Sequence, residues 1–413
     1  MALKNLAKKG KNYAIGLIIS FCLPTFAPVA GEKNSQPDVG NFYPMIQDYA
    51  DRGEMSFSYL ARDWPELEKW RILSRAKLHE LLAFDPAPAP LNPEILETIV
   101  EEGYVRYRVR YSVTRNRKTE AFLLIPSGLE RPAPAVLALH DHGGFYYFGK
   151  EKITKTDPAP RVLREFIGKS YGGRTYADEL AKKGFVVLCP DAFYFGSQRI
   201  DVNKVARHFI DQFPGLRSAD PNKSIEAFNE FCWPHETIVA KYLFAAGTTW
   251  PGVLFHGDRV SVDYLLTRPE VDPERIGCMG LSIGGFRSAH LFGLDPRIKV
   301  GVVAGWMTTY TMQLFDKLRW HTWMVYIPRL ISFLDVPDVV SLNAPRPLMV
   351  INCGQDGLYP IEAMEFADEK LKTIYRKIGK GEHYQGRFYD VPHSLNVEMQ
   401  DDAIAWLQRW LDD

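Results

Sequence analysis

The most informative segment of this chain for its architecture is Gly280-Leu281-Ser282-Ile283-Gly284-Gly285. It contains the pattern G-x-S-x-G between a short apolar run, Arg275–Met279, and a segment with helical spacing. A serine at a sharp strand-to-helix turn needs a strained backbone, and the flanking glycines let the strand and the helix approach each other. Free N–H groups at the start of the helix favour developing negative charge. The context therefore predicts a nucleophile elbow with Ser282 as the nucleophile.

An elbow serine needs an acid and a base, which follow it in the order Ser, then Asp or Glu, then His. The apolar run Pro347–Cys353 reads as a buried strand, and Asp356 lies in the glycine-containing loop after it. His393 lies between the last expected strand, which ends at Tyr389, and the last helical run. This loop belongs to the same sheet edge as the serine, so we predict Asp356 as the acid and His393 as the base.

Two other residues compete for these roles. His383 precedes the last expected strand, which would place it at the opposite edge of the sheet. Asp390 is another candidate acid, but it lies only three positions before His393, and Asp356 is the preferred orienting group.

The oxyanion hole is expected to use the backbone N–H of Ile283 and a second N–H from the loop after an earlier strand. That strand, Ala135–His140, runs into Asp141-His142-Gly143-Gly144. We favour the N–H of His142, with that of Gly143 as the alternative. The side chains of His140 and His142 are expected to order the loop. No second cluster of ligands accompanies them, so we expect neither a metal nor another cofactor.

The composition is that of an ordinary globular protein. The chain has 413 residues, of which 46% are apolar, 24% charged and 13% aromatic, with 50 basic and 50 acidic side chains. No basic stripe suggests nucleic acid as a partner. Cys189, Cys232, Cys278 and Cys353 follow the leader, and three of them lie in expected strands, which favours buried thiols over disulfides.

The first 31 residues read as a secretory signal peptide. Four lysines precede an apolar run, Ala14–Ala27, that is too short for a comfortable membrane span, and Val29-Ala30-Gly31 suits a cleavage site. We expect cleavage near Gly31, a secreted or periplasmic protein, and no stable membrane span afterwards. An uncleaved signal anchor is the alternative.

The rest of the chain divides into two parts. Residues 32–92 form an N-terminal extension with one helix, Trp64–Phe84, and a proline-rich linker. Residues 93–413 form the catalytic domain, which begins with an edge strand, Tyr104–Val113, and its hairpin partner. Strands and helices alternate from Ala135 onward, which predicts an α/β fold with a mostly parallel, doubly wound sheet and an antiparallel N-terminal edge. Two long insertions, near 145–174 and 306–342, follow strand ends and could overhang the site.

The chain resembles the α/β-hydrolase superfamily, and more closely the acetyl xylan esterase-like group of secreted bacterial esterases related to dienelactone hydrolase. The resemblance covers about residues 60 to 412. Proteins of this group often begin the oxyanion loop with His-Gly, whereas here Asp141 replaces the glycine. The segments that carry the resemblance are 139–144, 174–180, 271–277, 280–285 and 303–307.

The resemblance implies a serine carboxylesterase that acts on carbohydrate esters, with a small-molecule or polysaccharide ester as its partner. The alternatives are a uronic-acid methyl esterase, for which Arg174 or Arg287 could hold a carboxylate, and a non-catalytic binding protein on the same fold. We predict Trp306 as a sugar-stacking residue, although it could equally fill the core under its insertion. The polymer, the acyl group and the oligomeric state are left open by the sequence.

Overall fold

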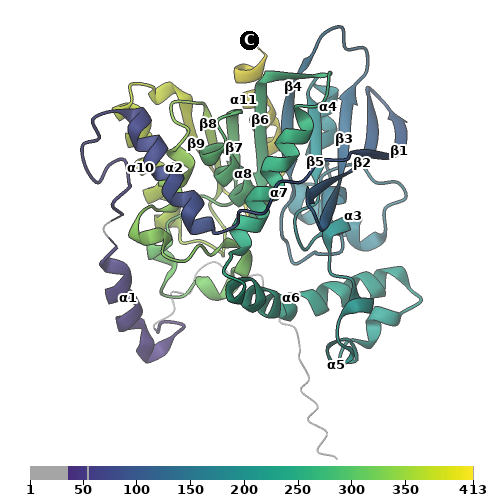
Figure 1. The fold of residues 1–413 in the computed structure, drawn as a ribbon, viewed down its shortest axis with the longest axis horizontal. Helices are drawn as coiled ribbons and strands as arrows, with labels where there is room; N and C mark the ends of the chain where they lie inside the picture. Colours follow the sequence, from purple (N-terminus) through teal and green to yellow (C-terminus); the bar gives the residue numbers. More distant parts are fainter. Residues whose placement is uncertain (1–35, 54, 413) are drawn as a thin grey trace, which may run out of the picture.

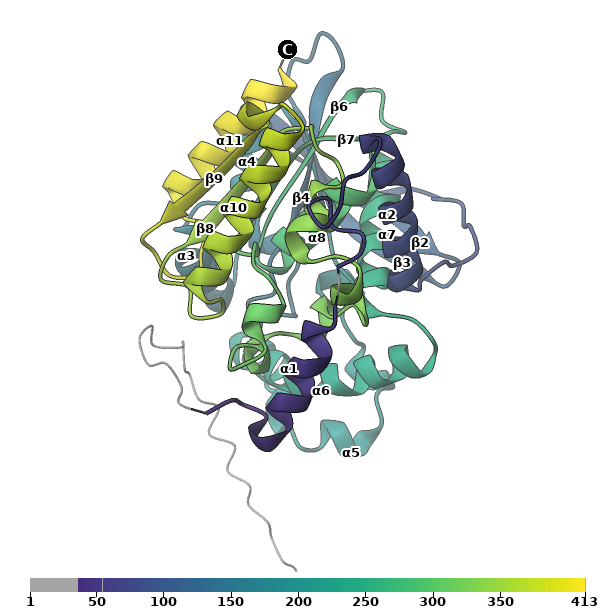
Figure 2. The ribbon, with the colours of Figure 1, turned by 90° about the vertical axis from the view of Figure 1, so that its left-hand side faces the viewer.

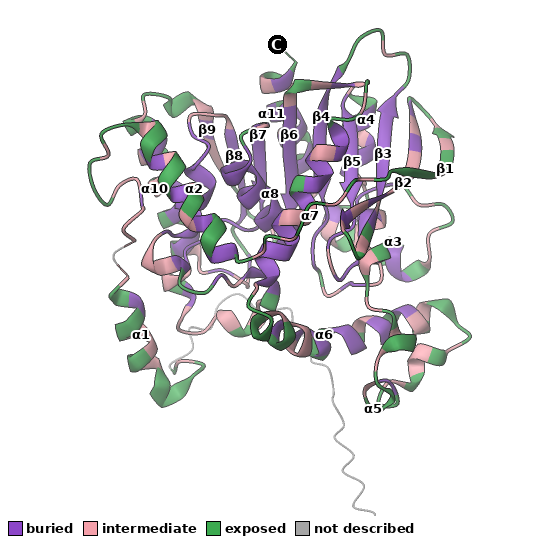
Figure 3. Ribbon diagram, in the orientation of Figure 1, coloured by how far each residue is buried: buried purple, intermediate pink, exposed green. Residues whose placement is uncertain are grey.

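A computed structural model describes residues 36–53 and 55–412 (Figure 1). The expected leader, residues 1–31, and its cleavage site lie outside the described residues. A nine-stranded sheet in the order β1-β2-β3-β5-β4-β6-β7-β8-β9 forms the centre of the molecule. The central strands β4, β5, β7 and β8 are almost entirely buried, whereas the edge strand β1 and the outer helices carry many exposed residues (Figure 3). This mixed sheet with helices around it is the α/β-hydrolase fold predicted from the sequence.

The first three strands are antiparallel, and a strand that the sequence analysis missed forms the edge. β2 (Tyr104–Thr114) pairs with β3 (Arg117–Pro126), as predicted, but β1 (Glu94–Glu101) covers its other side. The prediction of Tyr104–Val113 as the edge strand is therefore wrong. Its basic residues face acidic ones across the pair, with N–O distances of 3.4 Å for Arg106–Glu101 and 3.5 Å for Arg108–Glu97.

The remaining strands give the sheet its parallel part. β4, β6, β7, β8 and β9 run parallel in succession, and β5 pairs parallel to β4 and antiparallel to β3. Because parallel strands end at the same edge, the loops after them meet there. Their bounds are β4 Ala133–Leu139, β5 Val186–Pro190, β6 Val271–Leu281, β7 Ile298–Ala304, β8 Leu348–Cys353 and β9 Tyr384–Tyr389.

Helices cover both faces of the sheet and bury two hydrophobic clusters. α2, α7, α8, α9 and α10 pack on one face, and α4 and α11 on the other. Figure 2 shows α11 and α7 on opposite sides. The bounds are α2 Leu67–Leu82, α4 Tyr176–Lys182, α7 Trp250–Leu265, α8 Ile283–Leu294, α9 Val336–Ser341, α10 Ile361–Lys377 and α11 Val397–Leu411.

The two insertions contain short helical elements. The first contains α3 (Arg161–Tyr171) and the 3-10 turn Lys150–Lys152, and the second contains short 3-10 turns such as Trp323–Val325. α6 (Pro221–Ala245) follows the small helix α5 (Arg207–Ile210) and lies beneath the sheet in Figure 1. The first insertion, the second and α6 come together around the loop after β4, as the contacts below show.

The N-terminal extension has two helices rather than the one predicted, because α1 (Tyr43–Asp51) precedes α2. α1 was missed because it is only nine residues long and exposes most of its side chains. α2 is joined to the main core. Trp70 is fully buried, and the hydroxyl of Thr249, which caps α7, donates to the carbonyl of Leu82 at 2.6 Å.

All four cysteines of the described residues are buried free thiols, as expected. Within residues 36–53 and 55–412, no single helix is long and apolar enough to cross a membrane. By length and composition only, one pair of helices, α6 and α7, could do so together, with a bend of 86° between them.

Candidate active site

Ser282 lies at the turn between β6 and α8 with φ 59° and ψ −119°. A positive φ is costly for a residue with a side chain, and such strain persists only where the surroundings impose it. Here β6 and α8 meet so closely that a Cβ on Gly280 would lie 2.4 Å from the carbonyl oxygen of Gly284. A Cβ on Gly284 would lie 2.1 Å from the carbonyl oxygen of Leu139, at the end of β4. The backbone N–H of Ser282 donates to Ala304 at 2.9 Å, which ties the turn to the end of β7. The geometry is that of the predicted nucleophile elbow.

The predicted acid and base are in direct contact. Nδ1 of His393 lies 2.6 Å from Oδ2 of Asp356, whose side chain is fully buried. The other carboxyl oxygen accepts the N–H of Leu358 at 2.9 Å, which fixes the carboxyl group in its loop after β8. Because a carboxylate can only accept, Nδ1 carries the proton and Nε2 is left with its lone pair.

The imidazole of His393 and the turn at Ser282 both contact the same backbone segment, residues 304 and 305. A Cβ placed on Gly305 would lie 3.1 Å from Cε1 of His393, so the ring lies against this residue. Gly305 directly follows Ala304, the residue whose carbonyl binds the N–H of Ser282. The loops after β6, β7, β8 and β9 therefore bring together residues 282, 305, 356 and 393.

The surroundings of His393 raise the pKa of its ring. Burial lowers its pKa, but the nearby carboxylates of Asp356 and Asp141 outweigh burial, and the net pKa lies above the ordinary histidine value. Asp141 comes from the loop after β4, so this loop also contributes to the electrostatic environment of the ring.

The loop after β4 contains two glycines in the left-handed region. Gly143 and Gly144 have φ of 54° and 66°, a region that glycine enters at little cost. The N–H of Gly144 donates to Nδ1 of His142 at 3.0 Å. His142 and Gly143 thus remain the two candidates for the second donor, beside Ile283, which is the first residue of α8.

The ring of His140 is hydrogen-bonded within the protein through both of its nitrogens. Nδ1 of His140 contacts the carbonyl of Asp141 at 2.9 Å, and its Nε2 accepts the N–H of Ala192 at 3.1 Å. Burial lowers the pKa of His140 well below its usual range, so the ring is neutral. These contacts support the ordering role that the sequence analysis expected of the ring.

Glu236 of α6 joins the loop to the second insertion. Its carboxyl group is 3% exposed and accepts Nε2 of His142 at 2.7 Å and the hydroxyl of Tyr146 at 2.6 Å. The hydroxyl of Thr322 donates to the other oxygen at 2.7 Å, together with the N–H of Trp323 at 3.3 Å. Burial raises the pKa of Glu236, but His142 and the other donors lower it by more than burial raises it. The net pKa of Glu236 is therefore below its ordinary value.

Sequence reasoning missed two buried charged residues around the loop, Glu236 and Lys152. Lys152 is fully buried in the first insertion, and its ammonium donates to the carbonyls of Asp141 at 2.6 Å and His142 at 3.0 Å. A cluster of lysines in that insertion was visible in the sequence. Nothing in the local pattern showed which of them would turn inward.

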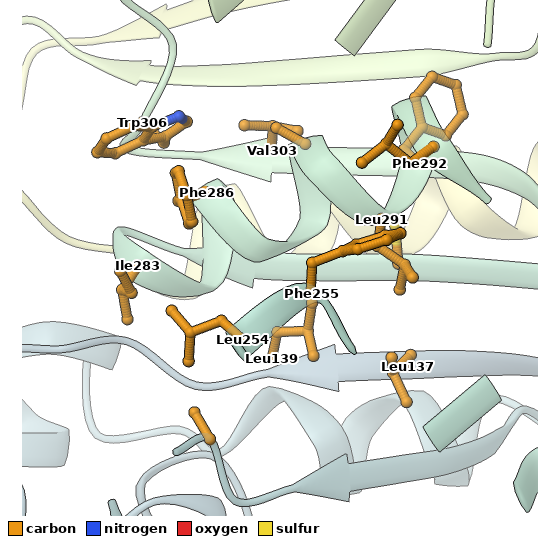
Figure 4. Close-up of a cluster of buried hydrophobic side chains, with 14 of the residues drawn as sticks. Leu137, Leu139, Leu254, Phe255, Ile283, Phe286, Leu291, Phe292, Val303 and Trp306 are labelled. Carbon is orange, nitrogen blue, oxygen red and sulfur yellow. The ribbon is translucent and has the colours of Figure 1, made fainter. Parts of the chain in front are cut away.

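Trp306 is a core side chain in this structure rather than an exposed stacking surface. It is 3% exposed and packs edge-on against Phe286 at 5.0 Å between ring centroids and against Tyr359 at 5.9 Å (Figure 4). His321 of the same insertion lies 6.4 Å away, and burial lowers its pKa to about 4. The alternative given with the prediction, a residue that fills the core under the insertion, matches this position.

The two arginines considered for a substrate carboxylate are both held by protein groups. Arg174 donates to Gln400 at 2.8 Å, and to the carbonyl of Val397 and the carboxylate of Asp401, all on α11. Arg287 is 2% exposed and forms a bidentate pair with Asp258, with a shortest distance of 2.6 Å. The structure therefore gives both guanidinium groups structural partners.

The rival acid and base have other partners. His383 belongs to a 3-10 turn before β9, where its Nδ1 contacts the carbonyl of Pro345 and its ring packs on Trp410 at 4.7 Å. Asp390 accepts the side-chain amide of Gln355 at 2.9 Å and is exposed. Nε2 of His383 lies 3.5 Å from the carboxylate of its chain neighbour Glu382, whereas the contact with Asp356 is made by His393.

Comparison with known proteins agrees with this architecture. The model of the dienelactone hydrolase family matches residues 146–307, about two fifths of the chain, and this region contains Ser282. YtaP of Bacillus subtilis (strain 168), a provisionally named hydrolase, is 25% identical over 343 residues. The alignment covers 83% of this chain and all of that protein.

Solved structures share the fold over most of the chain. A provisionally named acetyl xylan esterase from Bacteroides fragilis NCTC 9343 has a TM-score of 0.65 at 18% identity, covering 85% of this chain and 84% of that one. A glucuronoyl esterase from Solibacter usitatus has a TM-score of 0.58 at 14% identity, covering 86% and 97%. The chain therefore has the α/β-hydrolase fold that these esterases share, and a dienelactone hydrolase family domain lies over residues 146–307.

Proposed function

We propose that the protein is a serine carboxylesterase that hydrolyses carbohydrate esters through Ser282, His393 and Asp356. One observation carries the proposal: a strained elbow serine shares the 304–305 backbone with a histidine that is hydrogen-bonded to a buried carboxyl group. This is the arrangement that activates a serine hydroxyl, with a base oriented by a third group.

The proposed reaction has two halves. Nε2 of His393 takes the proton of Ser282 as its oxygen attacks the ester carbonyl, and Asp356 holds the ring and stabilises its cation. The N–H of Ile283 and that of His142 or Gly143 bind the oxyanion. The imidazolium then gives its proton to the departing alcohol, which leaves an acyl-enzyme. Water then attacks the acyl-enzyme with His393 again as base, the carboxylic acid leaves, and the imidazolium returns its proton to Ser282.

The fold neighbours named above support a carbohydrate ester as the substrate, because they are a provisionally named acetyl xylan esterase and a glucuronoyl esterase. Between these two chemistries, the acetyl ester suits the site better. A uronic acid ester would be favoured by a cation near the site, but Arg174 and Arg287, the two candidates, are already paired. The methyl esterase of uronic acids is the alternative function.

The proposal includes secretion. Its support is the leader pattern of residues 1–31 and the resemblance to secreted esterases. N-terminal sequencing of exported protein checks it, with Glu32 as the expected first residue, whereas an intact Met1 on membrane-bound material would indicate an anchor.

Activity is tested with nitrophenyl acetate, and then with acetylated and methyl-esterified polysaccharides, by measuring the acid or methanol released. We expect acetate release by the wild-type protein and labelling of Ser282 by a phosphonate. Ser282→Ala should fold normally and lose about 10⁴-fold or more of turnover, as triad deletions do. A variant that keeps a tenth of wild-type turnover would rule out the serine as nucleophile.

A further inference from the structure

Lys152 is a fully buried cation beside the proposed oxyanion loop. Its Nζ donates to the carbonyl oxygens of Asp141 at 2.6 Å and His142 at 3.0 Å, and lies 3.8 Å from a carboxyl oxygen of Asp141. The rings of Phe166 and Phe195 flank it at 5.3 Å and 4.8 Å. A buried ammonium is expensive unless it is paired, so this lysine needs an explanation.

The two carbonyls matter because of what lies at the other end of each peptide unit. A trans peptide is planar, and its C=O and N–H point in opposite directions. The carbonyl of Asp141 shares a peptide unit with the N–H of His142, and the carbonyl of His142 shares one with the N–H of Gly143. By holding both oxygens, a single cation fixes the direction of both candidate oxyanion donors.

We propose that Lys152 is a positioning residue for the oxyanion hole: it aims the N–H of His142 or Gly143 at the reacting oxygen. The positive charge on the carbonyl side also polarises the peptide, which makes its N–H a stronger donor. This inference rests on the proposed esterase function. It accounts for Asp141 at the position where the resembled group often has glycine, because the Asp141 carboxylate supplies a counter-charge.

Other contacts agree with this role. Asp141 accepts the hydroxyl of Tyr171 at 2.6 Å, and the ring of His140 also contacts the Asp141 carbonyl. Burial lowers the pKa of Lys152 to about 8, while Asp141, Asp191 and Glu151 counteract the burial. The cation is therefore kept by its carboxylate neighbours in a site that would otherwise favour the neutral amine.

The neighbouring Lys150 provides a matched control. It is 3% exposed in the same 3-10 turn, and its ammonium pairs with Asp191 at 2.9 Å and Glu151 at 2.8 Å. Its side chain contacts neither of the two carbonyls. Lys150→Met therefore removes an equally buried cation from the same turn without releasing the oxyanion loop.

The experiment compares Lys152→Met and Lys150→Met in the full-length protein. Turnover and KM are measured with nitrophenyl acetate, Ki with trifluoroacetophenone, and stability as Tm. Trifluoroacetophenone forms a tetrahedral adduct with the active serine, so its Ki reports on the oxyanion donors. We expect Lys152→Met to lower kcat at least about tenfold with KM within about twofold, and to raise Ki by a similar factor. Lys150→Met should lower Tm but change kcat and Ki by no more than about twofold.

The proposal is overturned if the two variants lose Tm, kcat and inhibitor affinity to the same degree, or if Lys152→Met keeps wild-type kcat and Ki. If Lys152→Met does not fold, Lys152→Gln takes its place: its amide NH2 removes the charge but keeps two donors. Its kcat and its Ki, each relative to the wild-type protein, are then compared in the same way. Ester hydrolysis by the wild-type protein, blocked by Ser282→Ala, is measured in parallel. A failure of the proposed function would appear in the wild-type protein, whereas a failure of this inference would appear only in the Lys152 variants.

Discussion

Oδ2 of Asp356 lies 2.6 Å from Nδ1 of His393, although 37 residues separate them in the chain. The contact fixes the tautomer of the ring, because the carboxylate can only accept and Nε2 is therefore left to act as base. It also raises the pKa of His393 against the opposing effect of burial. The role of Asp356 in fixing the tautomer is tested by substitution, and the raised pKa of His393 is tested by the pH dependence of activity.

Asp356→Asn should lower kcat by roughly 10³-fold or more, because the amide can hold the ring in the wrong tautomer. The kinetics are measured with nitrophenyl acetate. Asp390→Asn is the control, since Asp390 bonds only to the side chain of Gln355 among the contacts described. Comparable losses in both variants would contradict the assignment of Asp356.

The pH dependence follows from the raised pKa of His393. The base must be neutral to take the serine proton, so activity is lost as the pH falls through the folded-state pKa of the ring. Asp141→Asn removes one of the carboxylates that raise this pKa. The acid limb of the kcat/KM profile should therefore move to lower pH. A limb that stays in place would show that Asp141 does not influence the ring.

His393→Ala should reduce turnover about as severely as Ser282→Ala, whereas His383→Ala should keep most of it. The structure gives His383 a contact with Pro345 and Trp410, so its loss is expected to lower Tm instead. Turnover and Tm of the two variants separate these roles. The reverse result would place the base before β9 rather than after it.

Trp306→Ala should destabilise the protein by about 3–5 kcal/mol, as is typical when a large buried aromatic side chain is removed. The same fractional loss of activity is expected on nitrophenyl acetate and on an acetylated oligosaccharide, because a side chain that is 3% exposed offers no face to a sugar. Denaturant unfolding and the two assays check this. A selective rise in KM for the oligosaccharide would restore the stacking role predicted from the sequence.

Glu236→Gln should lower both stability and kcat, because its four donors would then face an amide that can accept through only one oxygen. We expect about 1–3 kcal/mol of destabilisation for the unsatisfied buried groups. Thr322→Val removes just one of these bonds and serves as the milder comparison. The acid contributes nothing to the site if Glu236→Gln retains wild-type kcat at a reduced Tm.

The sequence alone determined the parts of this protein that depend on local chemistry. The elbow at Ser282 could be predicted because a strained turn demands glycines at fixed positions. The strand predicted at Pro347–Cys353 is observed as β8, Leu348–Cys353, because a short continuous apolar run marks a buried strand, and the last helical run is observed as α11, whose apolar residues recur with the helical period. The order of Ser282, Asp356 and His393 then followed from the position of each loop.

Only the tertiary structure showed the features that depend on contacts between residues far apart in the chain. β1 exposes most of its residues and is recognisable as a strand only beside the arginines of β2. Trp306 turned inward because Phe286 and Tyr359 surround it. Glu236 meets His142 across 94 residues, and Lys152 turns under the oxyanion loop where Lys155 of the same insertion is exposed. Hydrophobic period and turn chemistry act over a few residues, whereas the partner of a buried charge depends on the complete fold.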